Sequence, residues 1–386
     1  MKKDYHRETK LMHAGRNPDD YFGVVNPPIC RTSTILYKDM AAYFDPNTKF
    51  RYGRIGNPLS HAFEEAVSEL EGGYNAITAP SGFCAISTTF FAFLKAGDHV
   101  LIVDSCYPPT RFFANKQLRD FGVEVEFYDP MIGADIKNLI RGNTALIYLE
   151  SPSSATFEVQ DVPAIVKVAK ECGVITIMDN TYSAGVLFRP LEHGINISVQ
   201  SAAKYIGGHS DVNLGFVVAD NATNYKILKS CAVNLGVCAA AEDLYLAMRG
   251  LRTLEMRLEH AGRNMLPILE WFKTRPEVQE LYSPVLETSR GHDIWKRDFS
   301  GANGIFSVLF NPKYSMDDIA RFVDALELFP VGSSWGGYES LVQPQDMKEY
   351  RDNWDKDGVF IRFQIGNENT KDLIADLEQS IGDLTC

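Results

Sequence analysis

ALIYLESPSSATFEVQDVPAIVKVAKECGVITIMDN, residues 145–180, is the stretch that decides the fold. It begins and ends with short apolar runs, at 145–149 and 174–178. Between them lies a helical pattern, with Asp161 as the expected N-cap and Gly173 directly after its end. Two apolar strands joined through a helix predict a parallel pair that is covered on both faces.

Further apolar runs continue this alternation, at 99–103, 197–199 and 215–218. The fold class is therefore α/β, with a mostly parallel central sheet and helices on both faces. A helical stretch at 242–273 leads into a smaller α+β unit, with strand-like segments at 305–310 and 359–363 and helices at 316–326 and 371–381. We expect an irregular arm at 1–55 that contacts a neighbouring subunit, a large domain at 56–245 and a C-terminal domain at 246–386.

The composition excludes several classes of protein. A formal charge of −12 without long basic runs argues against a nucleic-acid or anionic-membrane partner. The chain has no apolar run of about 18 residues, and its charged first residues are not followed by the apolar core of a signal peptide. Its seven cysteines form no Cys-x-x-Cys pair, so we expect reduced thiols and a cytoplasmic protein. No spacing of His, Asp and Glu predicts a metal site.

Polar residues follow several of the expected strands. Parallel α/β sheets bind ligands beyond the carboxyl ends of their strands, so we expect one site to collect Asp104, Tyr107, Glu150, Asp179, Asn180, Ser201 and Lys204. Asp179 directly follows a buried strand, where an ionised carboxylate needs a cationic partner such as a protonated pyridine nitrogen. The alternative is a helix N-cap or an acid on the rim of the sheet.

Lys204 lies among small and apolar residues, in Ser201-Ala-Ala-Lys204-Tyr-Ile-Gly-Gly. Partial burial lowers the pKa of an amine and makes it a better nucleophile for a Schiff base. A surface lysine whose stem packs along the protein is equally compatible with this stretch when it is read alone.

Ser81, Gly82 and Phe83 open an apolar helix after Pro80. Free amides at a helix N-terminus suit a phosphate, although an ordinary glycine turn is at least as compatible. Two arginines are candidate anion ligands: Arg54 for a phosphate, and Arg362, at the end of a strand-like run, for a substrate carboxylate. Isolated arginines are more often surface residues. The chain lacks both Gly-x-x-x-x-Gly-Lys and Gly-x-Gly-x-x-Gly, which argues against a nucleotide or dinucleotide.

Taken together, these segments resemble the Cys/Met-metabolism enzymes that use pyridoxal 5′-phosphate (PLP) and have fold type I. The resemblance covers nearly the whole chain. It rests on Tyr52-Gly-Arg54, Leu70-Glu-Gly-Gly73, Ser81-Gly82, Tyr107, Glu150-Ser-Pro152, Asp179-Asn-Thr181, residues 201–211 and Arg362.

The resemblance implies a role for each candidate residue. Lys204 would hold PLP as a Schiff base and move the substrate's Cα proton, Asp179 would pair with the pyridinium nitrogen, and Tyr107 would stack on the ring. The remaining implied cofactor contacts are Ser81, Gly82, Phe83 and Ser201, with Tyr52 and Arg54 from a neighbouring subunit. Arg362 and Ser334 would bind the substrate carboxylate. An arm that completes another subunit's site requires a homo-oligomer, and the family is usually tetrameric.

Two segments resemble bacterial cystathionine β-lyases in particular. Ser334-Trp335-Gly-Gly carries a tryptophan where γ-type relatives usually have a smaller residue, so Trp335 is a candidate substrate contact, with a core aromatic as the alternative. Residues 150–158 lack the Asn-Pro that is common in the family. The chain departs from the family pattern at Ala203, where a threonine usually bonds the phosphate, at Ser333, where β-lyases often have tyrosine, and at Phe83, in place of methionine.

The resemblance predicts a PLP-dependent carbon–sulfur lyase that converts L-cystathionine to homocysteine, pyruvate and ammonia by β-elimination. The alternatives are a cystathionine γ-synthase, γ-lyase or methionine γ-lyase activity, and racemase or cysteine desulfhydrase side activities. A non-catalytic protein with this fold is disfavoured by Lys204, Asp179 and Tyr107. A dinucleotide-dependent oxidoreductase is disfavoured by the missing glycine fingerprint.

Overall fold

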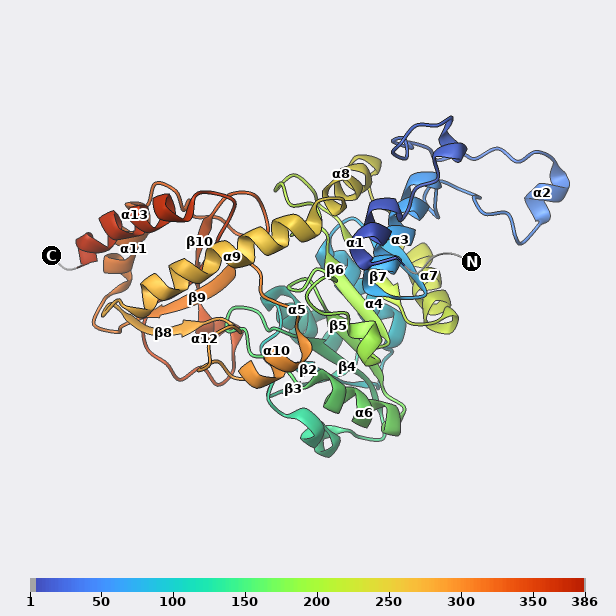
Figure 1. Ribbon diagram of the computed structural model, residues 1–386. Helices are drawn as coiled ribbons and strands as arrows, with labels where there is room; N and C mark the ends of the chain where they lie inside the picture. Colours follow the sequence, from blue (N-terminus) through green and yellow to red (C-terminus); the bar gives the residue numbers. More distant parts are fainter. Residues whose placement is uncertain (1–4, 385–386) are drawn as a thin grey trace.

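The computed structural model describes residues 5–384 and contains two sheets (Figure 1). The larger sheet has the strand order β1-β7-β6-β5-β4-β2-β3. Its strands are β1 (Asn75–Ala79), β2 (His99–Val103), β3 (Glu124–Tyr128), β4 (Thr144–Glu150), β5 (Ile175–Asp179), β6 (Ile197–Ser201) and β7 (Gly215–Ala219). The pairs from β3 through β2, β4 and β5 to β6 are parallel, and β7 is antiparallel to both β6 and β1. The predicted mostly parallel sheet is confirmed.

Both faces of this sheet are covered, because every residue of β2 and β7 is buried. The helices of this part are α3 (Pro58–Glu71), α4 (Gly82–Phe93), α5 (Pro108–Phe113), α6 (Val162–Cys172), α7 (Ala222–Leu235) and α8 (Ala241–Leu251). The predicted ends of α6 are present. The Asp161 side chain accepts a hydrogen bond from Ala164 N at 3.2 Å, and Gly173 has φ 69°, which favours glycine.

The C-terminal part contains the smaller sheet, which is antiparallel throughout. Its order is β10-β11-β9-β8, with β8 (Val278–Tyr282), β9 (Ile305–Phe310), β10 (Leu341–Gln345) and β11 (Phe360–Gln364). The helices here are α9 (Leu254–Lys273), α10 (His292–Asp298), α11 (Met316–Asp324), α12 (Met347–Tyr350) and α13 (Thr370–Ile381). A hydrophobic cluster of its own, which includes Phe272, Phe306 and Phe363, holds this part together.

Several element boundaries differ from those expected. The helical stretch at 242–273 is divided, because α8 ends at Leu251 and α9 begins at Leu254. The expected domain boundary at 245/246 falls inside α8 and stays a prediction. The arm, expected to be irregular, contains two helices too short for a periodic pattern, α1 (Arg7–His13) and α2 (Met40–Phe44). The short turns are 3₁₀ helices at Pro18–Tyr21, Gly133–Leu139, Pro190–His193 and Gly382–Leu384, and a π turn at Ala114–Leu118.

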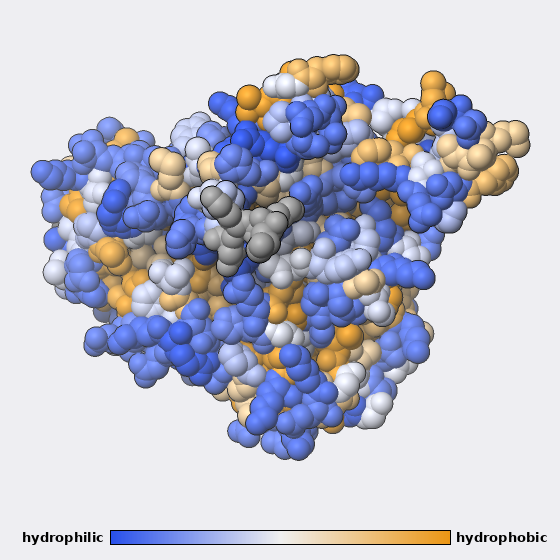
Figure 2. All heavy atoms as spheres, turned by 45° about the vertical axis from the view of Figure 1, so that its right-hand side comes forward, coloured by the Kyte–Doolittle hydropathy of each residue, from blue (hydrophilic) through white to orange (hydrophobic). Residues whose placement is uncertain are grey.

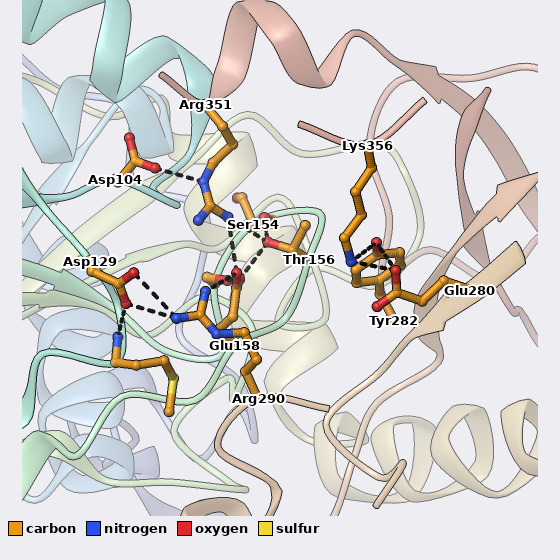
Figure 3. Close-up of polar contacts among 12 residues, drawn as sticks. Asp104, Asp129, Ser154, Thr156, Glu158, Glu280, Tyr282, Arg290, Arg351 and Lys356 are labelled. Atoms are coloured by element: carbon orange, nitrogen blue, oxygen red, sulfur yellow. Dashed lines mark hydrogen bonds and ion pairs between the residues drawn. The ribbon is translucent and has the colours of Figure 1, made fainter. Parts of the chain in front are cut away.

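Arg351, directly after α12, ties the C-terminal part to the larger sheet (Figure 3). Its Nε donates to Asp104 Oδ2 at 2.8 Å, and its Nη1 donates to Glu158 Oε1 and Thr156 Oγ1 at 3.0 Å each. Asp104 follows β2, and Glu158 lies between β4 and α6. These largely buried ion pairs fix the chain after α12 against the carboxyl edge of the larger sheet.

Within residues 5–384, no helix is long and apolar enough to cross a membrane. The cysteines in that range are free, and Cys386 lies outside the described residues. The same range contains no group of three or more His, Cys, Asp or Glu side chains arranged to hold a metal ion.

Candidate active site

Three neighbouring strands of the larger sheet end at one edge and carry the central residues. β4 ends at Glu150 and β5 ends at Asp179, and the two residues are paired in register. β6 ends at Ser201, and Lys204 follows in the turn after it. The strand order β6-β5-β4 therefore brings Lys204, Asp179 and Glu150 to the same edge of the sheet.

The Lys204 side chain is largely buried and does not extend into solvent. Its Nζ donates to Ser334 Oγ at 2.6 Å and lies 5.6 Å from the centre of the Trp335 ring. Burial, and next the positive charge of Arg362, lower the pKa of Lys204 to about 8, and the Asp179 carboxylate opposes this shift. A lowered pKa leaves more of the amine neutral and nucleophilic at neutral pH.

Asp179 is buried at the end of its strand. It accepts hydrogen bonds from Thr181 N at 2.9 Å and from the Tyr148 hydroxyl at 3.5 Å. Burial raises the pKa of Asp179, whereas the bonds from Thr181 and Tyr148 and the charge of Lys204 lower it. A cationic ring nitrogen beside this carboxyl would offset the cost of burying its charge.

The N-terminus of α4 lies against the turn after β6. The Ser81 side chain caps the helix by accepting a hydrogen bond from Cys84 N at 3.0 Å. Gly82 packs closely on Ser201, because a Cβ at position 82 would come within 2.5 Å of Ser201 Cβ. Phe83 is the second residue of α4, where a backbone amide has no partner within the helix. Ser81, Gly82, Phe83 and Ser201 thus lie together at the start of α4, where free backbone amides suit an anion.

Arg362 reaches the site from β11 of the smaller sheet. Its Nη2 donates to Ser334 O at 3.0 Å and to Gln343 Oε1. Burial lowers the pKa of Arg362 to about 10, and the hydroxyls of Tyr107 and Tyr350 oppose this shift. Ser334 has φ 123°, a strained conformation for a residue with a side chain. Its hydroxyl contacts Lys204 and its carbonyl contacts Arg362, so Ser334 connects the two cations.

Trp335 is both near the site and part of the core. Its ring packs on Tyr205 with centroids 5.7 Å apart, and the Lys204 amine lies over the same ring at 5.6 Å from its centre. Ser333, one of the departures from the β-lyase pattern, accepts a hydrogen bond of 3.5 Å from Gln343 Nε2. The small Ser333 side chain therefore takes part in the Gln343 contact that also holds Arg362.

Tyr107 is the first residue before α5, and it is 41% exposed. Its backbone N–H donates to Glu150 Oε2 at 2.6 Å. Burial first, and then the negative charges of Asp179 and Glu150, raise the pKa of the Tyr107 hydroxyl, whereas Arg362 lowers it. The Tyr107 hydroxyl therefore interacts electrostatically with carboxyls at the edge of the larger sheet and with Arg362 of the smaller sheet.

Tyr52 and Arg54 lie in the arm, apart from these residues. Tyr52 pairs with Thr34 in an isolated β-bridge, and Arg54 Nη1 donates to Val233 O on α7 at 2.7 Å. Neither residue has a described contact with Lys204 of the same chain. A single chain therefore does not bring the arm residues to its own Lys204.

Three contacts of the site were missed by sequence reasoning. Tyr148 and Thr181 both bond to Asp179, and Gln343 bonds to Arg362. Tyr148 could have been found, because it shares a strand face with Glu150 two residues on. Thr181 belongs to the Asp179-Asn-Thr181 segment that carries the family resemblance, but the resemblance implies no role for it. Gln343 lies in a strand that contains a proline, and nothing in the sequence around it indicates a strand or a binding residue.

The residues fit PLP. A buried amine of lowered pKa suits the aldehyde, a buried carboxyl with a nearby cation suits the pyridinium nitrogen, and the amides of α4 beside Ser201 suit the phosphate. One expected phosphate contact is absent, since Ala203 has no hydroxyl.

Comparisons with known proteins agree with this fit. The profile of the family described as Cys/Met metabolism PLP-dependent enzyme matches residues 8–382. The chain is 44% identical to a putative cystathionine β-lyase of Rhizobium johnstonii, over 96% of this chain and 94% of the relative. It is 39% identical to cystathionine β-lyase MetC of Escherichia coli, over 96% and 97%. The crystal structure of cystathionine γ-synthase from Xanthomonas oryzae matches 99% of both chains, with a TM-score of 0.92 and 28% identity. The chain is thus a fold type I enzyme and belongs to the Cys/Met-metabolism family of PLP-dependent enzymes.

Proposed function

We propose that the protein is a carbon–sulfur lyase that cleaves L-cystathionine by β-elimination into homocysteine, pyruvate and ammonia. The observation that carries the proposal is a buried amine, Lys204, held within the influence of the Asp179 carboxyl and the Arg362 guanidinium. Such a set can move a Cα proton and bind an amino-acid carboxylate. The full-length relatives named cystathionine β-lyase favour cystathionine as the substrate.

Lys204, Asp179 and Tyr107 have separate roles in the proposed reaction. PLP, when bound, supplies an electron sink for the bonds at the substrate's Cα. Lys204 accepts the Cα proton, and its lowered pKa lets it release that proton to the departing sulfur near neutral pH. Asp179 would pair with the pyridine nitrogen and favour its protonated form through its negative charge. Tyr107 would stack on the ring.

Binding of the substrate and of the phosphate uses separate groups. Arg362 holds the α-carboxylate with its planar fork, and Ser334 orients both Arg362 and Lys204. Trp335 lies beside the Lys204 amine, and we propose it as a contact for the thioether chain of the substrate. The phosphate is held by Ser81, Gly82, Phe83 and Ser201.

The arm belongs to the site of a second copy of the chain, in a homo-oligomer that we propose to be a tetramer. Apolar side chains gather on the projecting arm (Figure 2), where Phe22, Leu36, Met40 and Phe44 are exposed. Such a surface favours burial against another chain. Mixing an Arg54→Ala protein with a Lys204→Ala protein under subunit exchange should restore activity, because some mixed sites are intact. A monomer, or no recovery on mixing, contradicts this arrangement.

The product decides between β- and γ-elimination. With L-cystathionine, pyruvate and homocysteine support the proposal, and 2-oxobutyrate and cysteine refute it. The γ reaction is the second candidate, because the γ-synthase named above shares the whole fold. A panel with methionine, cysteine and L-alanine in the same assay measures the desulfhydrase and racemase side activities.

We further propose a cytoplasmic location, supported by the free cysteines of the described residues. Cell fractionation with an antibody tests it, and recovery outside the cytoplasm would overturn it.

A further inference from the structure

Glu150 is a second buried carboxyl beside Asp179, and the proposed reaction does not use it. The residues at the ends of β4 and β5 are paired in register, and Glu150 and Asp179 are only 8% and 7% exposed. Two adjacent carboxylates in a poorly solvated place repel each other, so one of them retains a proton. The charge of Lys204 stabilises an ionised Asp179, whereas the hydrogen bonds to the Glu150 carboxyl come from uncharged groups. This difference favours Glu150 as the member that keeps the proton.

The Glu150 carboxyl bridges two loops at the edge of the sheet. Its Oε2 accepts a hydrogen bond from Tyr107 N at 2.6 Å, and its Oε1 lies 2.6 Å from Ser154 Oγ. Ser154 N donates in turn to Ser105 O at 3.0 Å. The loop before α5 and the loop after β4 are thus joined by the Glu150 side chain and by this backbone hydrogen bond.

Tyr107 depends on this bridge for its position. It begins α5 without a side-chain capping bond, and its ring is partly exposed. Burial, followed by the charge of Asp179, raises the pKa of Glu150 to about 8, which agrees with a neutral carboxyl at pH 7. The carboxyl accepts the bond from the Tyr107 amide with one oxygen and the bond from the Ser154 hydroxyl with the other, and a neutral carboxyl keeps this accepting capacity.

We propose that Glu150 is a positioning residue: as a neutral carboxyl it fixes the backbone of Tyr107, holds the Tyr107 ring over the cofactor site, and leaves Asp179 as the charged partner. This proposal rests on the role given to Tyr107 in the proposed function. It does not depend on which carbon–sulfur bond is cleaved.

The first test uses protein without cofactor. Amide hydrogen exchange of the peptide that contains Tyr107 should become at least about tenfold faster in Glu150→Ala, because the amide loses its acceptor. Glu150→Gln should restore protection, since its amide oxygen accepts the same bond. Glu124→Gln, at an exposed position of β3, is the matched control. Equal exchange in Glu150→Ala and the unchanged protein would overturn the proposal.

The second test measures exchange of the Cα proton of L-alanine in D₂O, which needs no leaving group. Loss of this exchange therefore reports on Glu150 even where cystathionine proves to be the wrong substrate. Glu150→Ala should slow the exchange by about 10- to 100-fold, and Glu150→Gln should keep it within about threefold. Glu150→Gln as slow as Glu150→Ala would show that an ionised carboxylate is needed, and would overturn the neutral role.

A double-mutant cycle shows whether Glu150 acts through Tyr107. In Tyr107→Ala, the further change Glu150→Ala should slow the exchange by clearly less than it does alone, because no ring is left to position. Fully multiplicative effects contradict the proposal. Should Glu150→Ala fail to fold, Ser154→Ala removes the other end of the bridge, and the same non-multiplicative result with Tyr107→Ala is expected.

Discussion

At the scale of single residues, Arg362 is the clearest test of substrate binding. Arg362→Ala should raise the KM for cystathionine by about 10- to 100-fold, because a hydrogen bond to a charged group contributes ~1.5–3 kcal/mol. The amount of PLP bound should not change, since Arg362 contacts Ser334 and Gln343 on the other sheet and none of the residues proposed to hold the phosphate. Arg321→Ala, at an exposed position of α11, is the control. An unchanged KM in Arg362→Ala would remove the carboxylate-binding role.

Lys204 and Asp179 could be predicted from sequence because their positions follow from strand ends. A residue directly after a buried parallel strand lies at the carboxyl edge whatever the details of the fold. Gln343 and Tyr350 could not be predicted. Their closeness to Arg362 depends on the register of an antiparallel sheet and on a short helix, and neither leaves a periodic pattern.

At the scale of elements, the start of α4 is expected to decide how tightly PLP binds. Gly82→Ala places a Cβ within 2.5 Å of Ser201 Cβ, so the helix N-terminus must move away from the turn after β6. PLP affinity, measured by titrating the cofactor-free protein, should fall by about tenfold, the equivalent of ~1.4 kcal/mol. Gly142→Ala, where the added Cβ meets nothing within 4 Å, is the control. Equal affinity in both variants would mean that α4 does not hold the phosphate.

The elements predicted correctly are those with a strong local signal. The strands β2 and β7, which are fully buried, and β4, which is mostly buried, are nearly continuous apolar runs, and α6 has a capping aspartate and a terminal glycine. β3 and β8 carry glutamates, and β10 contains Pro344, so their composition did not predict strands. Their strand structure comes from pairing with neighbours, which only the tertiary fold supplies.

At the scale of the whole molecule, Arg351 should determine how firmly the two sheets are held together. Arg351→Met removes the cation that Asp104 and Glu158 share, and leaves Arg111 beside Asp104 and Arg290 3.8 Å from Glu158. Removal of one partner from a buried ion pair costs about 3–5 kcal/mol, and the remaining arginines reduce this cost, so the urea midpoint should fall by less than this figure implies and by more than in an exposed pair. Arg141→Met, which breaks an exposed pair, should cost less than about 1 kcal/mol. A midpoint equal to that of Arg141→Met would show that Arg351 is not structurally important.

The stability of the cofactor-free protein should fall as pH rises from about 5 to 8, because its buried carboxyls lose their protons in this range. Burial raises the pKa of Glu64 and Glu71 to about 7 and of Glu150 to about 8, from an ordinary value of 4.5. The folded state then binds more protons than the unfolded state in this window, so raising the pH favours unfolding. Urea unfolding at several pH values should show a shallower slope for Glu71→Gln. If the slope in Glu71→Gln equals that of the unchanged protein, Glu71 does not contribute to the pH dependence.

The most direct measurement is reduction of the PLP-loaded protein with borohydride, followed by identification of the labelled peptide. A covalent link at Lys204, with a visible band that disappears on reduction, is the predicted result. Lys167→Ala, at an exposed position of α6, should be labelled normally, and Lys204→Ala should not be labelled. A label on another lysine, or a Lys204→Ala protein that keeps the band, would contradict the assignment of Lys204 as the cofactor's anchor.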